Sequence, residues 1–305
     1  MAFSVTILGS SSALPSHDRY PTAHLVNHDE RFFLIDCGEG TQMQLRRFKQ
    51  PMSRINHIFI SHLHGDHVFG LFGLISSFSL QGRTSDLHLY CPPLLEKIIT
   101  THLNFFDQDM QYDIIYHPYQ AKKSEIIYED KKLTVETLPL KHRIPCCGFI
   151  FREKQKEPNV RKEAISLYHL SIQEIVSLKK GASHIVREEH KIPAAELIIA
   201  PPPPLSYAFC TDTRYFNTLI RKLQGVNLLY YESTFLHKDR KLARETYHST
   251  AVQAATIARE AGVGKLILGH FSSRYKNMDL FLQEAREIFP ESYLAEDGRI
   301  FTAEK

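Results

Sequence analysis

The sequence predicts a layered α/β protein. Short apolar runs rich in Val, Ile and Phe recur along the chain, each as long as a strand and several bounded by Gly, Pro or Asp. Stretches with helical periodicity lie between some of these runs, and a mixed order of strands and helices is typical of layered α/β folds. The 305 residues and the 43% hydrophobic content also suffice for a substantial core.

Each predicted element follows from its local pattern. The apolar runs predict strands over residues 3–8, 31–36, 57–62, 86–91, 133–140, 148–153, 196–200, 207–212, 227–233 and 265–270. Apolar residues at helical spacing predict helices over residues 40–48, 92–106, 215–224, 250–262 and 278–289. One helix has clear end signals, because Thr250 and Gln253 form a capping box and Gly262 suits the helix end.

The composition changes between residues 152 and 193. This segment is rich in charge, with lysines and arginines interleaved with glutamates and one short amphipathic stretch. It is predicted to be an excursion from the core, and a solvated surface insertion is the plainest interpretation of such a segment. The prolines at 201–204 predict a stiff, extended connector to the next strand.

Composition limits the function classes only loosely. A net charge of +3 is too weak to indicate nucleic-acid binding by itself, although it is compatible with an anionic substrate. The cysteines are odd in number and sparse, which favours a reducing cytoplasm over a secreted disulfide framework. No signal pattern begins the chain and no stretch approaches the roughly 20 apolar residues of a membrane span, so we expect a soluble, unexported protein.

The stretch FISHLHGDHVFGLFGL, residues 59–74, carries the strongest chemical signal. It contains four titratable side chains directly after an apolar run, where such groups are costly to desolvate unless something pairs with them: His62, His64, Asp66 and His67. In an extended loop, residues two apart point the same way, so His62 and His64 could share one cation while Asp66 and His67 turn toward a second. These ligand types suit zinc, with manganese or iron possible.

Two cations need further ligands, and three later strand ends supply the right residue types. His142, Asp212 and His270 each follow a strand-like run, and strand ends are where a site can open. Singly these signals are weak, because a lone histidine at a strand end is more often structural. Together with the first cluster they form a complete set, in which the two oxygens of Asp212 could bridge both ions.

Other residues are predicted to support this centre. Asp36 ends an apolar run and could accept hydrogen bonds beneath the metal loop. His248 lies just before a predicted helix, where free backbone N–H groups favour a phosphate and the imidazole could donate a proton to a leaving oxygen; a surface histidine before a cap is the alternative. Glu232 could orient His248. Three cysteines are predicted to be structural, namely Cys146, Cys147 and Cys210.

The motif SHLHGDHVFGLFGL resembles that of the metallo-β-lactamase superfamily, and its companions narrow the resemblance to the ribonuclease Z family, whose members mature transfer RNA 3′ ends. The companion motifs follow in order along nearly the whole chain: FLIDCGEGTQMQL, KHRIPCCGF, PPPPLSYAFCTDTRY, YYESTF, HSTAVQAATIAREAG and LGHFSSRY. The most specific are GEGTQ at residues 38–42 and HST at residues 248–250.

The resemblance implies roles for individual residues. One zinc ion would be bound by His62, His64 and His142, the other by Asp66, His67 and His270, with Asp212 bridging the two. This gives two Zn²⁺ per subunit, with Mn²⁺ possible. Asp66 matches the family's proton acceptor, and His248 matches the histidine thought to assist the phosphate or leaving group. Glu232 completes the predicted catalytic set.

The resemblance also implies an architecture. It predicts a four-layer αβ/βα sandwich, a single domain over residues 1–305 with residues 152–193 inserted as a protruding substrate-binding arm. The protein would act as a cytoplasmic homodimer, in which the arm of one subunit grips the tRNA bound at the other. The chain departs from the family at one place: residues 152–193 lack the usual Gly-Pro-rich motif, although Lys179, Lys180 and Gly181 resemble the basic end of an arm.

The predicted function is a zinc-dependent endoribonuclease that removes the 3′ trailer from precursor tRNA, leaving a 3′-hydroxyl on the tRNA and a 5′-phosphate on the trailer. An alternative is a small-molecule phosphodiesterase or another hydrolase of the same fold, against which the HST motif and the arm argue. A metal-free RNA-binding relative is the other alternative, and the complete ligand set argues against it.

Overall fold

The computed structural model describes residues 3–14, 16, 18–106, 110–187 and 190–304. The chain forms two compact units. Unit 1 contains the residues up to Glu129, Thr134–Phe151 and the residues from Leu205 onward, and unit 2 contains Asp130–Leu133 and Arg152–Pro204. No helix among the described residues is long and apolar enough to cross a membrane.

Unit 1 is built on two sheets, each with seven strands in the described part of the chain. The first sheet has the order β18-β1-β2-β3-β4-β5-β6. Its strands are β1 (Phe3–Gly9), β2 (Ala23–His28), β3 (Arg31–Ile35), β4 (Ile55–Phe59), β5 (Leu87–Cys91), β6 (Ile114–Pro118) and β18 (Ile300–Thr302). Pairing is antiparallel from β18 to β3 and parallel from β3 to β6.

The second sheet has the order β17-β16-β15-β14-β9-β8-β7. Its strands are β7 (Ile126–Glu129), β8 (Leu133–Pro139), β9 (Cys147–Glu153), β14 (Ser206–Cys210), β15 (Leu228–Glu232), β16 (Lys265–Gly269) and β17 (Ser292–Leu294). The strands from β14 to β17 run parallel, so the carboxyl ends of β14, β15 and β16 meet at one edge of the sheet.

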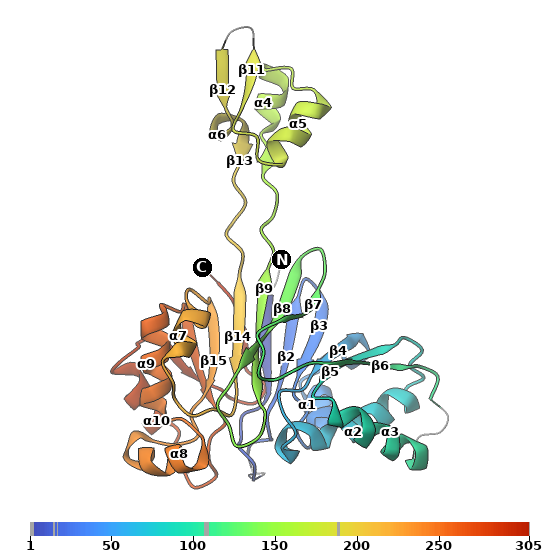
Figure 1. The fold of residues 1–305 in the computed structure, drawn as a ribbon, viewed down its shortest axis with the longest axis vertical. Helices are drawn as coiled ribbons and strands as arrows, with labels where there is room; N and C mark the ends of the chain where they lie inside the picture. The colour runs from blue at the N-terminus through green and yellow to red at the C-terminus, as the bar shows by residue number, and fades with distance from the viewer. Residues whose placement is uncertain (1–2, 15, 17, 107–109, 188–189, 305) are drawn as a thin grey trace. The chain divides into compact units, whose positions relative to one another are not determined.

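Helices cover the outer face of each sheet, which gives the predicted four layers (Figure 1). On the first sheet lie α1 (Thr41–Arg47), α2 (Gly65–Leu80) and α3 (Leu94–Phe106), packed through one apolar core. On the second lie α7 (Thr218–Leu223), α9 (Ala251–Ala261) and α10 (Asp279–Arg286), packed through another. Shorter helices are α8 (Arg240–Thr246), η1 (Met52–Arg54) and η2 (His237–Asp239). The α/β sandwich predicted from the sequence is confirmed.

Aromatic rings fill the layer between the two sheets. Phe33 of β3 meets Phe151 of β9 with ring centroids 5.8 Å apart, and Phe59 of β4 meets Phe149 at 5.6 Å. Each of these side chains is fully buried. Burial of such rings makes the largest contribution to the packing of a core. The layer therefore fixes the sheets face to face, and with them the loops that leave their strand ends.

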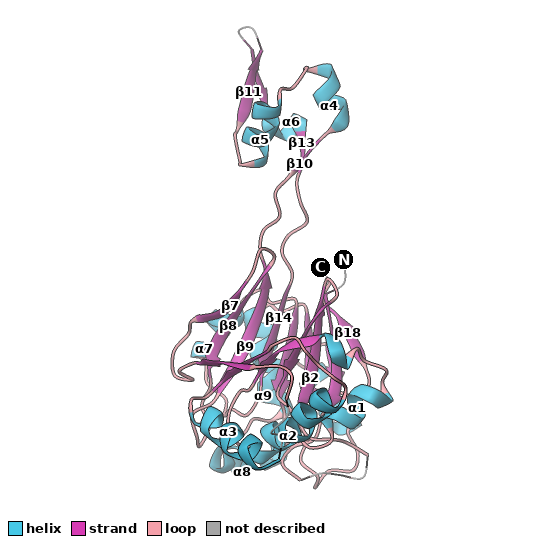
Figure 2. Ribbon diagram, turned by 90° about the vertical axis from the view of Figure 1, so that its right-hand side faces the viewer, coloured by secondary structure: helices cyan, strands magenta, loops and turns pink. Residues whose placement is uncertain are grey.

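Unit 2 is an ordered small fold, shown with its helices and strands in Figure 2. It contains β10 (Asn159–Val160), α4 (Lys162–Leu167), α5 (Ile172–Lys179), β11 (His184–Arg187), β12 (His190–Pro193), α6 (Ala194–Leu197) and β13 (Ile198–Ile199). A small apolar core includes Ala164, Leu178 and Leu197. The strand predicted over residues 196–200 is present but shorter, because α6 takes up the first part of that range and Ile198–Ile199 pairs with β10.

Helix α2 is the main element that the sequence pattern missed. Its sequence, GDHVFGLFGLISSFSL, contains glycines that disfavour a helix and apolar residues without a clear face. Gly70 has a packing reason, since a Cβ there would lie 2.0 Å from the carbonyl oxygen of Gly38. The Gly70 N–H donates to the Cys37 carbonyl at 2.9 Å, and the Cys37 N–H donates to the His67 carbonyl at 2.8 Å. The loop after β3 is thus fastened to the first turns of α2.

Candidate metal centre

The predicted ligands all lie where strands of unit 1 end. His62 and His64 follow β4, and Asp66 and His67 lie in the first turn of α2, which comes directly after them. The three other ligands, His142, Asp212 and His270, follow β8, β14 and β16. The structure brings every one of them into two adjoining groups: His62, His64, His142 and Asp212, and Asp66, His67 and His270. Residues far apart in the sequence therefore converge on one edge of the sandwich, as the pattern of strand ends predicted.

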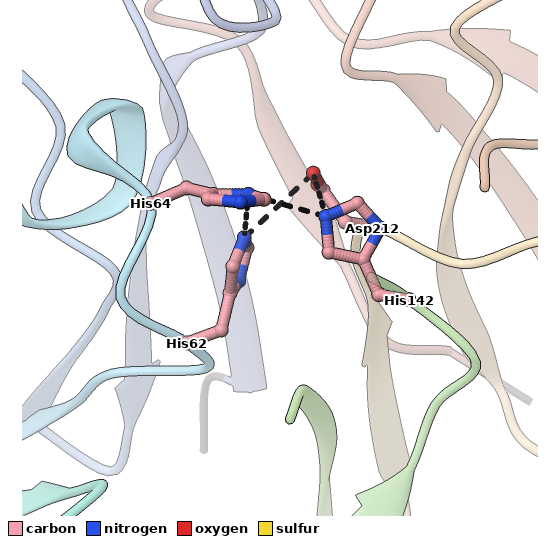
Figure 3. Close-up of side chains that lie close together, drawn as sticks. All are labelled: His62, His64, His142 and Asp212. Carbon is pink, nitrogen blue, oxygen red and sulfur yellow. Dashed lines mark hydrogen bonds and ion pairs between the residues drawn. The ribbon is translucent and has the colours of Figure 1, made fainter. Parts of the chain in front are cut away.

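The first group surrounds one point (Figure 3). His64 Nδ1 lies 3.0 Å from His62 Nε2 and 3.1 Å from His142 Nε2. Asp212 Oδ2 lies 3.7 Å from His62 Nε2 and 3.6 Å from His142 Nε2. Three imidazole nitrogens and one carboxylate oxygen thus face the same small space.

The second group has the same form. Asp66 Oδ2 lies 3.4 Å from His67 Nε2 and 3.5 Å from His270 Nε2. The other oxygen of Asp212, Oδ1, lies 3.4 Å from His67 Nε2 and 3.1 Å from His270 Nε2. Asp212 therefore presents one oxygen to each group, which is the arrangement of a bridging carboxylate.

These spacings fit ligands around metal ions. Two atoms that each lie about 2.0–2.1 Å from a tetrahedral ion are separated by about 3.3 Å. The buried Nε2 atoms of His67 and His270 have no hydrogen-bond partner among the described residues, although such atoms almost always have one. Both nitrogens belong to the second group, where one cation would satisfy them. The first group offers three imidazole nitrogens and a carboxylate oxygen to another ion, so the residues present fit a two-ion centre.

The ring nitrogens on the far side of these histidines are held by neighbouring groups. His67 Nδ1 lies 2.7 Å from Asp36 Oδ2, and His270 Nδ1 lies 2.9 Å from Thr234 Oγ1. His62 Nδ1 contacts Ser61 Oγ at 2.9 Å, and His142 Nδ1 contacts the Tyr247 carbonyl at 3.3 Å. Such contacts fix both the tautomer and the ring orientation of a metal-binding histidine.

Asp36 has the supporting position predicted from the sequence. Its backbone φ is 55°, a left-handed conformation that aspartate tolerates better than most residues. Its carboxylate accepts hydrogen bonds from the Ser61 N–H at 2.7 Å, from Ser61 Oγ at 2.8 Å and from His67 Nδ1. This one buried carboxylate therefore ties the loop after β4 to the first turn of α2.

The charges of the two groups differ. Burial lowers the pKa of His62, His64 and His142, which favours the neutral form that binds a cation. Burial also disfavours a charged His67, but the Asp66, Asp36 and Asp212 carboxylates outweigh it and raise the pKa of His67 well above its usual range. His67 thus favours positive charge more strongly than the histidines of the first group.

His248 and Glu232 form a pair beside the second group. His248 Nδ1 lies 2.9 Å from Glu232 Oε1, and the Glu232 side chain is fully buried. Burial alone would lower the pKa of His248, but Glu232 outweighs burial and raises that pKa to about 9. A nitrogen of His248 also lies within 4.8 Å of ligand atoms of Asp212 and His270, so its ring borders the metal centre.

The helix start after His248 has fewer free backbone N–H groups than the sequence suggested. The predicted capping box is present: the Gln253 N–H donates to Thr250 Oγ1, and Gln253 Oε1 accepts from the Thr250 N–H. The Ala251 N–H donates to the Phe235 carbonyl at 3.1 Å. Because these N–H groups are already engaged, the start of α9 offers little to a phosphate, and the imidazole of His248 becomes its more important group.

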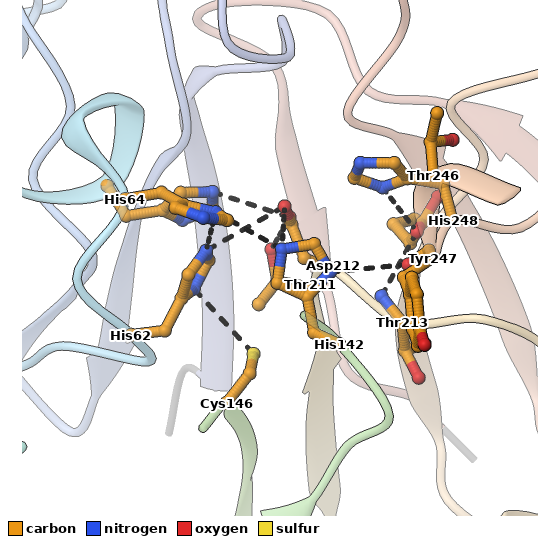
Figure 4. Close-up of polar contacts among 12 residues, drawn as sticks. His62, His64, His142, Cys146, Thr211, Asp212, Thr213, Thr246, Tyr247 and His248 are labelled. Atoms are coloured by element: carbon orange, nitrogen blue, oxygen red, sulfur yellow. Dashed lines mark hydrogen bonds and ion pairs between the residues drawn. The ribbon is translucent and has the colours of Figure 1, made fainter. Parts of the chain in front are cut away.

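Sequence reasoning missed several supporting groups, which Figure 4 shows in part. Cys146, predicted to be only structural, places Sγ 3.6 Å from His62 Nδ1. Tyr247 has φ 62° at the end of α8, which turns its carbonyl toward His142. Thr234 contacts Glu232, His248 and His270 through one hydroxyl. The conformation of Tyr247 had no signal in the sequence; Thr234 stands in YYESTF, two residues after Glu232.

A cavity of about 730 Å³ opens onto this centre. Among its lining residues are His64, Asp66, His142, Asp212, His248 and His270. The arrangement places two metal-binding points, a carboxylate and a carboxylate-supported imidazole on one accessible surface. Such a site can hydrolyse an ester of phosphoric or carboxylic acid.

Comparison with protein families places the chain among metallo-β-lactamase-like proteins. A model described as "Beta-lactamase superfamily domain" matches residues 174–271. A model described as "Anti-Pycsar protein Apyc1" matches residues 3–156. The two matches together include all the candidate ligands.

Similar proteins extend over almost the whole chain. A ribonuclease Z of Bacteroides fragilis is 45% identical over 296 residues, which is 97% of each chain. A ribonuclease Z of Porphyromonas gingivalis is 40% identical over the same coverage. The crystal structure of the short form of human tRNase Z has a TM-score of 0.73 at 25% identity, covering 99% of this chain and all of that one. The Bacillus subtilis protein YhfI, at 17% identity and a TM-score of 0.69, shares the fold.

Proposed function

This chain belongs to the ribonuclease Z family and is a metal-dependent endoribonuclease of tRNA 3′ processing; from that premise we propose that it uses two zinc ions to cut the 3′ trailer from precursor tRNA. The products are a 3′-hydroxyl on the tRNA and a 5′-phosphate on the trailer. The observation that supports this most strongly is Asp212, whose two oxygens face two separate groups of histidines.

The proposed cofactor chemistry follows from the ligand set. His62, His64 and His142 would hold one ion and Asp66, His67 and His270 the other, and Asp212, which presents one oxygen to each group, would contribute a ligand to both. Two divalent ions close together activate water and stabilise the charge that develops on a phosphodiester during displacement. Zinc suits this mixture of imidazole and carboxylate, and Mn²⁺ is the next candidate.

The remaining steps belong to side chains of the protein. Asp66 accepts a proton from the water that attacks phosphorus, while the bond from phosphorus to the O3′ of the mature tRNA breaks. His248 gives a proton to that departing O3′, and Glu232, 2.9 Å from its Nδ1, holds the ring in position and supports its charge. The tRNA therefore ends in a 3′-hydroxyl, and the trailer keeps the phosphate at its 5′ end.

The main rival is a small-molecule phosphodiesterase on the same fold. The two functions differ in substrate size, so rates on two substrates separate them. Purified zinc-loaded protein should cleave precursor tRNA with a trailer far faster, per kcat/KM, than it hydrolyses bis(p-nitrophenyl) phosphate. Equal or reversed preference would favour the rival, and end-group analysis of the tRNA product would test the predicted 3′-hydroxyl.

We propose that residues 152–193 form the substrate-binding arm. Unit 2, which contains them, has its own small core, and α5 begins with a capping box formed by Ser171 and Glu174. Glu174 also pairs with Arg187 at 2.9 Å, which ties α5 to β11. An ordered unit of this kind can present Lys179 and Lys180 to RNA phosphates without large loss of conformational entropy.

Removal of unit 2 tests whether it binds the RNA while unit 1 carries out the hydrolysis. Replacing residues 155–204 by a short Gly-Ser linker should leave hydrolysis of bis(p-nitrophenyl) phosphate within about threefold, because the two-sheet core and the metal ligands lie in unit 1. Cleavage of precursor tRNA should fall at least 100-fold, mainly through KM, because non-specific phosphate contacts supply much of the affinity. An unchanged KM for precursor tRNA would contradict the arm assignment.

Asp36 offers a milder test of the metal centre. Asp36→Asn keeps the shape and the tolerated backbone conformation but turns an N–H group toward one of the present donors. The affinity for the ion held by His67 should fall about 10- to 100-fold, as is usual when the group orienting a ligand is lost. Competition with a zinc-binding dye measures this, with Asp113→Asn, an exposed carboxylate, as the control.

Assembly and location complete the proposal. The family resemblance supports a homodimer in the cytoplasm, in which the arm of one subunit serves the site of the other. Mixing the arm-deleted protein with a His64→Ala protein tests this arrangement. Recovery of precursor cleavage in the mixture would support service in trans, and no recovery under conditions of subunit exchange would contradict it.

A further inference from the structure

A second cavity adjoins the metal centre and is unusually rich in positive charge. It has a volume of about 710 Å³. Its lining consists of Lys141, Arg214, Tyr215, Arg240, Lys241, Arg244, His248 and Gln253. A smaller hollow of about 420 Å³ continues from it and shares Arg214, Lys241 and Arg244. No acidic residue lines the larger cavity, and Glu245 is the acidic residue in the lining of the smaller one.

These cations are held in place without being neutralised. The Arg214 guanidinium lies 5.2 Å from the centre of the Tyr247 ring, and Lys141 Nζ lies 4.6 Å from the centre of the Phe216 ring. The Arg214 N–H donates to the Lys141 carbonyl at 3.0 Å, which joins the segments after β8 and β14. Among the described residues, His248 pairs with Glu232, but no ion pair links the lysines and arginines of the lining to a carboxylate. Unpaired, gathered cations of this kind suit a polyanion.

Helix α8 supplies three of the basic side chains that line the cavity. Arg240, Lys241 and Arg244 lie one and three residues apart along it, and all three are exposed. Residues three or four apart share a helix face, so Arg244 lies beside both of the others on that face. The left-handed Tyr247 then ends α8 and leads directly to His248. The same short segment therefore carries the basic side chains of the cavity and places the imidazole of His248 beside them.

The position of His248 determines which part of an RNA strand this cavity would take. In an in-line displacement the attacking and leaving oxygens lie on opposite sides of phosphorus. Asp66, the proposed proton acceptor, lines the metal cavity but not the basic one, whereas His248, the proposed donor to the leaving O3′, lines both. The nucleotide that carries the leaving oxygen therefore lies on the side of the basic cavity.

We propose that this basic cavity, resting on the function proposed above, binds the RNA backbone on the 5′ side of the cleaved bond. Its ligands are the phosphates of the last nucleotides of the mature tRNA. The 5′-phosphorylated trailer leaves from the other side of the metal centre. The RNA strand thus crosses the site in one 5′-to-3′ direction, which the basic side chains of α8 determine.

Binding of the two separate products tests this polarity without relying on catalysis. The triple variant Arg240→Ala, Lys241→Ala, Arg244→Ala and the unchanged full chain would be titrated, in zinc-loaded form, with mature tRNA ending in a 3′-hydroxyl and with a 5′-phosphorylated trailer oligonucleotide. The variant should bind mature tRNA at least 10-fold more weakly. Its slope of log affinity against log salt should fall by about 2–3, since each phosphate contact contributes about one unit. Its trailer affinity should change less than twofold.

A matched control removes the same charge elsewhere. Lys97, Lys122 and Lys123 are exposed and line neither cavity, so the corresponding triple alanine variant should bind both products as the unchanged chain does. Equal losses in the two variants, or a loss of trailer binding instead of tRNA binding, would overturn the proposal. Metal content and the unfolding midpoint confirm that each variant is folded. Failure of the unchanged chain to cut precursor tRNA at all would count against the proposed function, and that result is separate from these affinities.

Discussion

Asp212→Ala should release both metal ions and reduce cleavage of precursor tRNA at least about 1,000-fold. Each group of histidines loses an oxygen ligand in this variant, because Asp212 Oδ2 faces His62 and His142 while Oδ1 faces His67 and His270. Loss of two ions removes several kcal/mol of transition-state stabilisation, and about 1.4 kcal/mol corresponds to tenfold in rate. Metal analysis after gel filtration and single-turnover cleavage measure the two effects.

The comparison for this variant is Asp113→Ala, which removes an exposed carboxylate that does not line the metal cavity. That protein should keep its metal and its rate. His64→Ala provides an intermediate case, since only the first group contains His64. If Asp212→Ala kept two ions per chain, the bridging role inferred from its two oxygens would be wrong.

His248→Ala should lower cleavage about 100- to 10,000-fold while both ions stay bound. That range is the usual contribution of a positioned general acid. His270 and Asp212, which lie near His248, keep their own positions because Thr234 and the other histidines contact them. Metal content separates this outcome from that of Asp212→Ala. Full activity, or loss of an ion, would show that His248 is not the donor to the leaving oxygen.

Glu232→Gln refines the same assignment through pH. Glu232 raises the pKa of His248 to about 9, so the protonated donor persists above neutral pH in the present protein. Removing the carboxylate charge lowers this pKa, and the alkaline limb of the rate profile should then move to lower pH. If the alkaline limb of the pH–rate profile does not move in Glu232→Gln, the pKa of a group other than His248 determines that limb.

The sequence predicted the fold well where periodicity and strand ends are regular. The parallel strands β14, β15 and β16 are largely apolar runs. Glu232 is the last residue of β15, and Asp212 and His270 follow β14 and β16 within two residues, so all three could be placed in advance. Helix α2 was missed because its glycines disfavour a helix locally, whereas Gly70 serves close packing against the loop after β3, which no local rule detects. Residues 152–193 of unit 2 were predicted as a charged insertion and, through the family resemblance, as an arm. The helices and the small core of unit 2 were not predicted, since that core is formed by a few scattered apolar residues.

The candidate site shows a similar limit. The ligand residues were identified from the spacing of histidines and aspartates, but which nitrogen each histidine presents depends on its neighbours in space. His64 presents Nδ1 to the first group, whereas His67 presents Nε2 to the second because Asp36 holds its Nδ1. The basic cavity beside His248 is formed by segments distant in the sequence, so charge counting along the chain could not reveal it.

The most direct test of the central claim is a zinc titration of metal-free protein in the presence of a precursor tRNA labelled at the end of its trailer. We predict no cleavage without metal, a linear rise in activity to two zinc ions per chain, and release of the trailer as one intact, 5′-phosphorylated fragment. Undiminished cleavage after chelation, or stepwise shortening of the trailer from its 3′ end in place of that single fragment, would contradict a two-ion endonuclease.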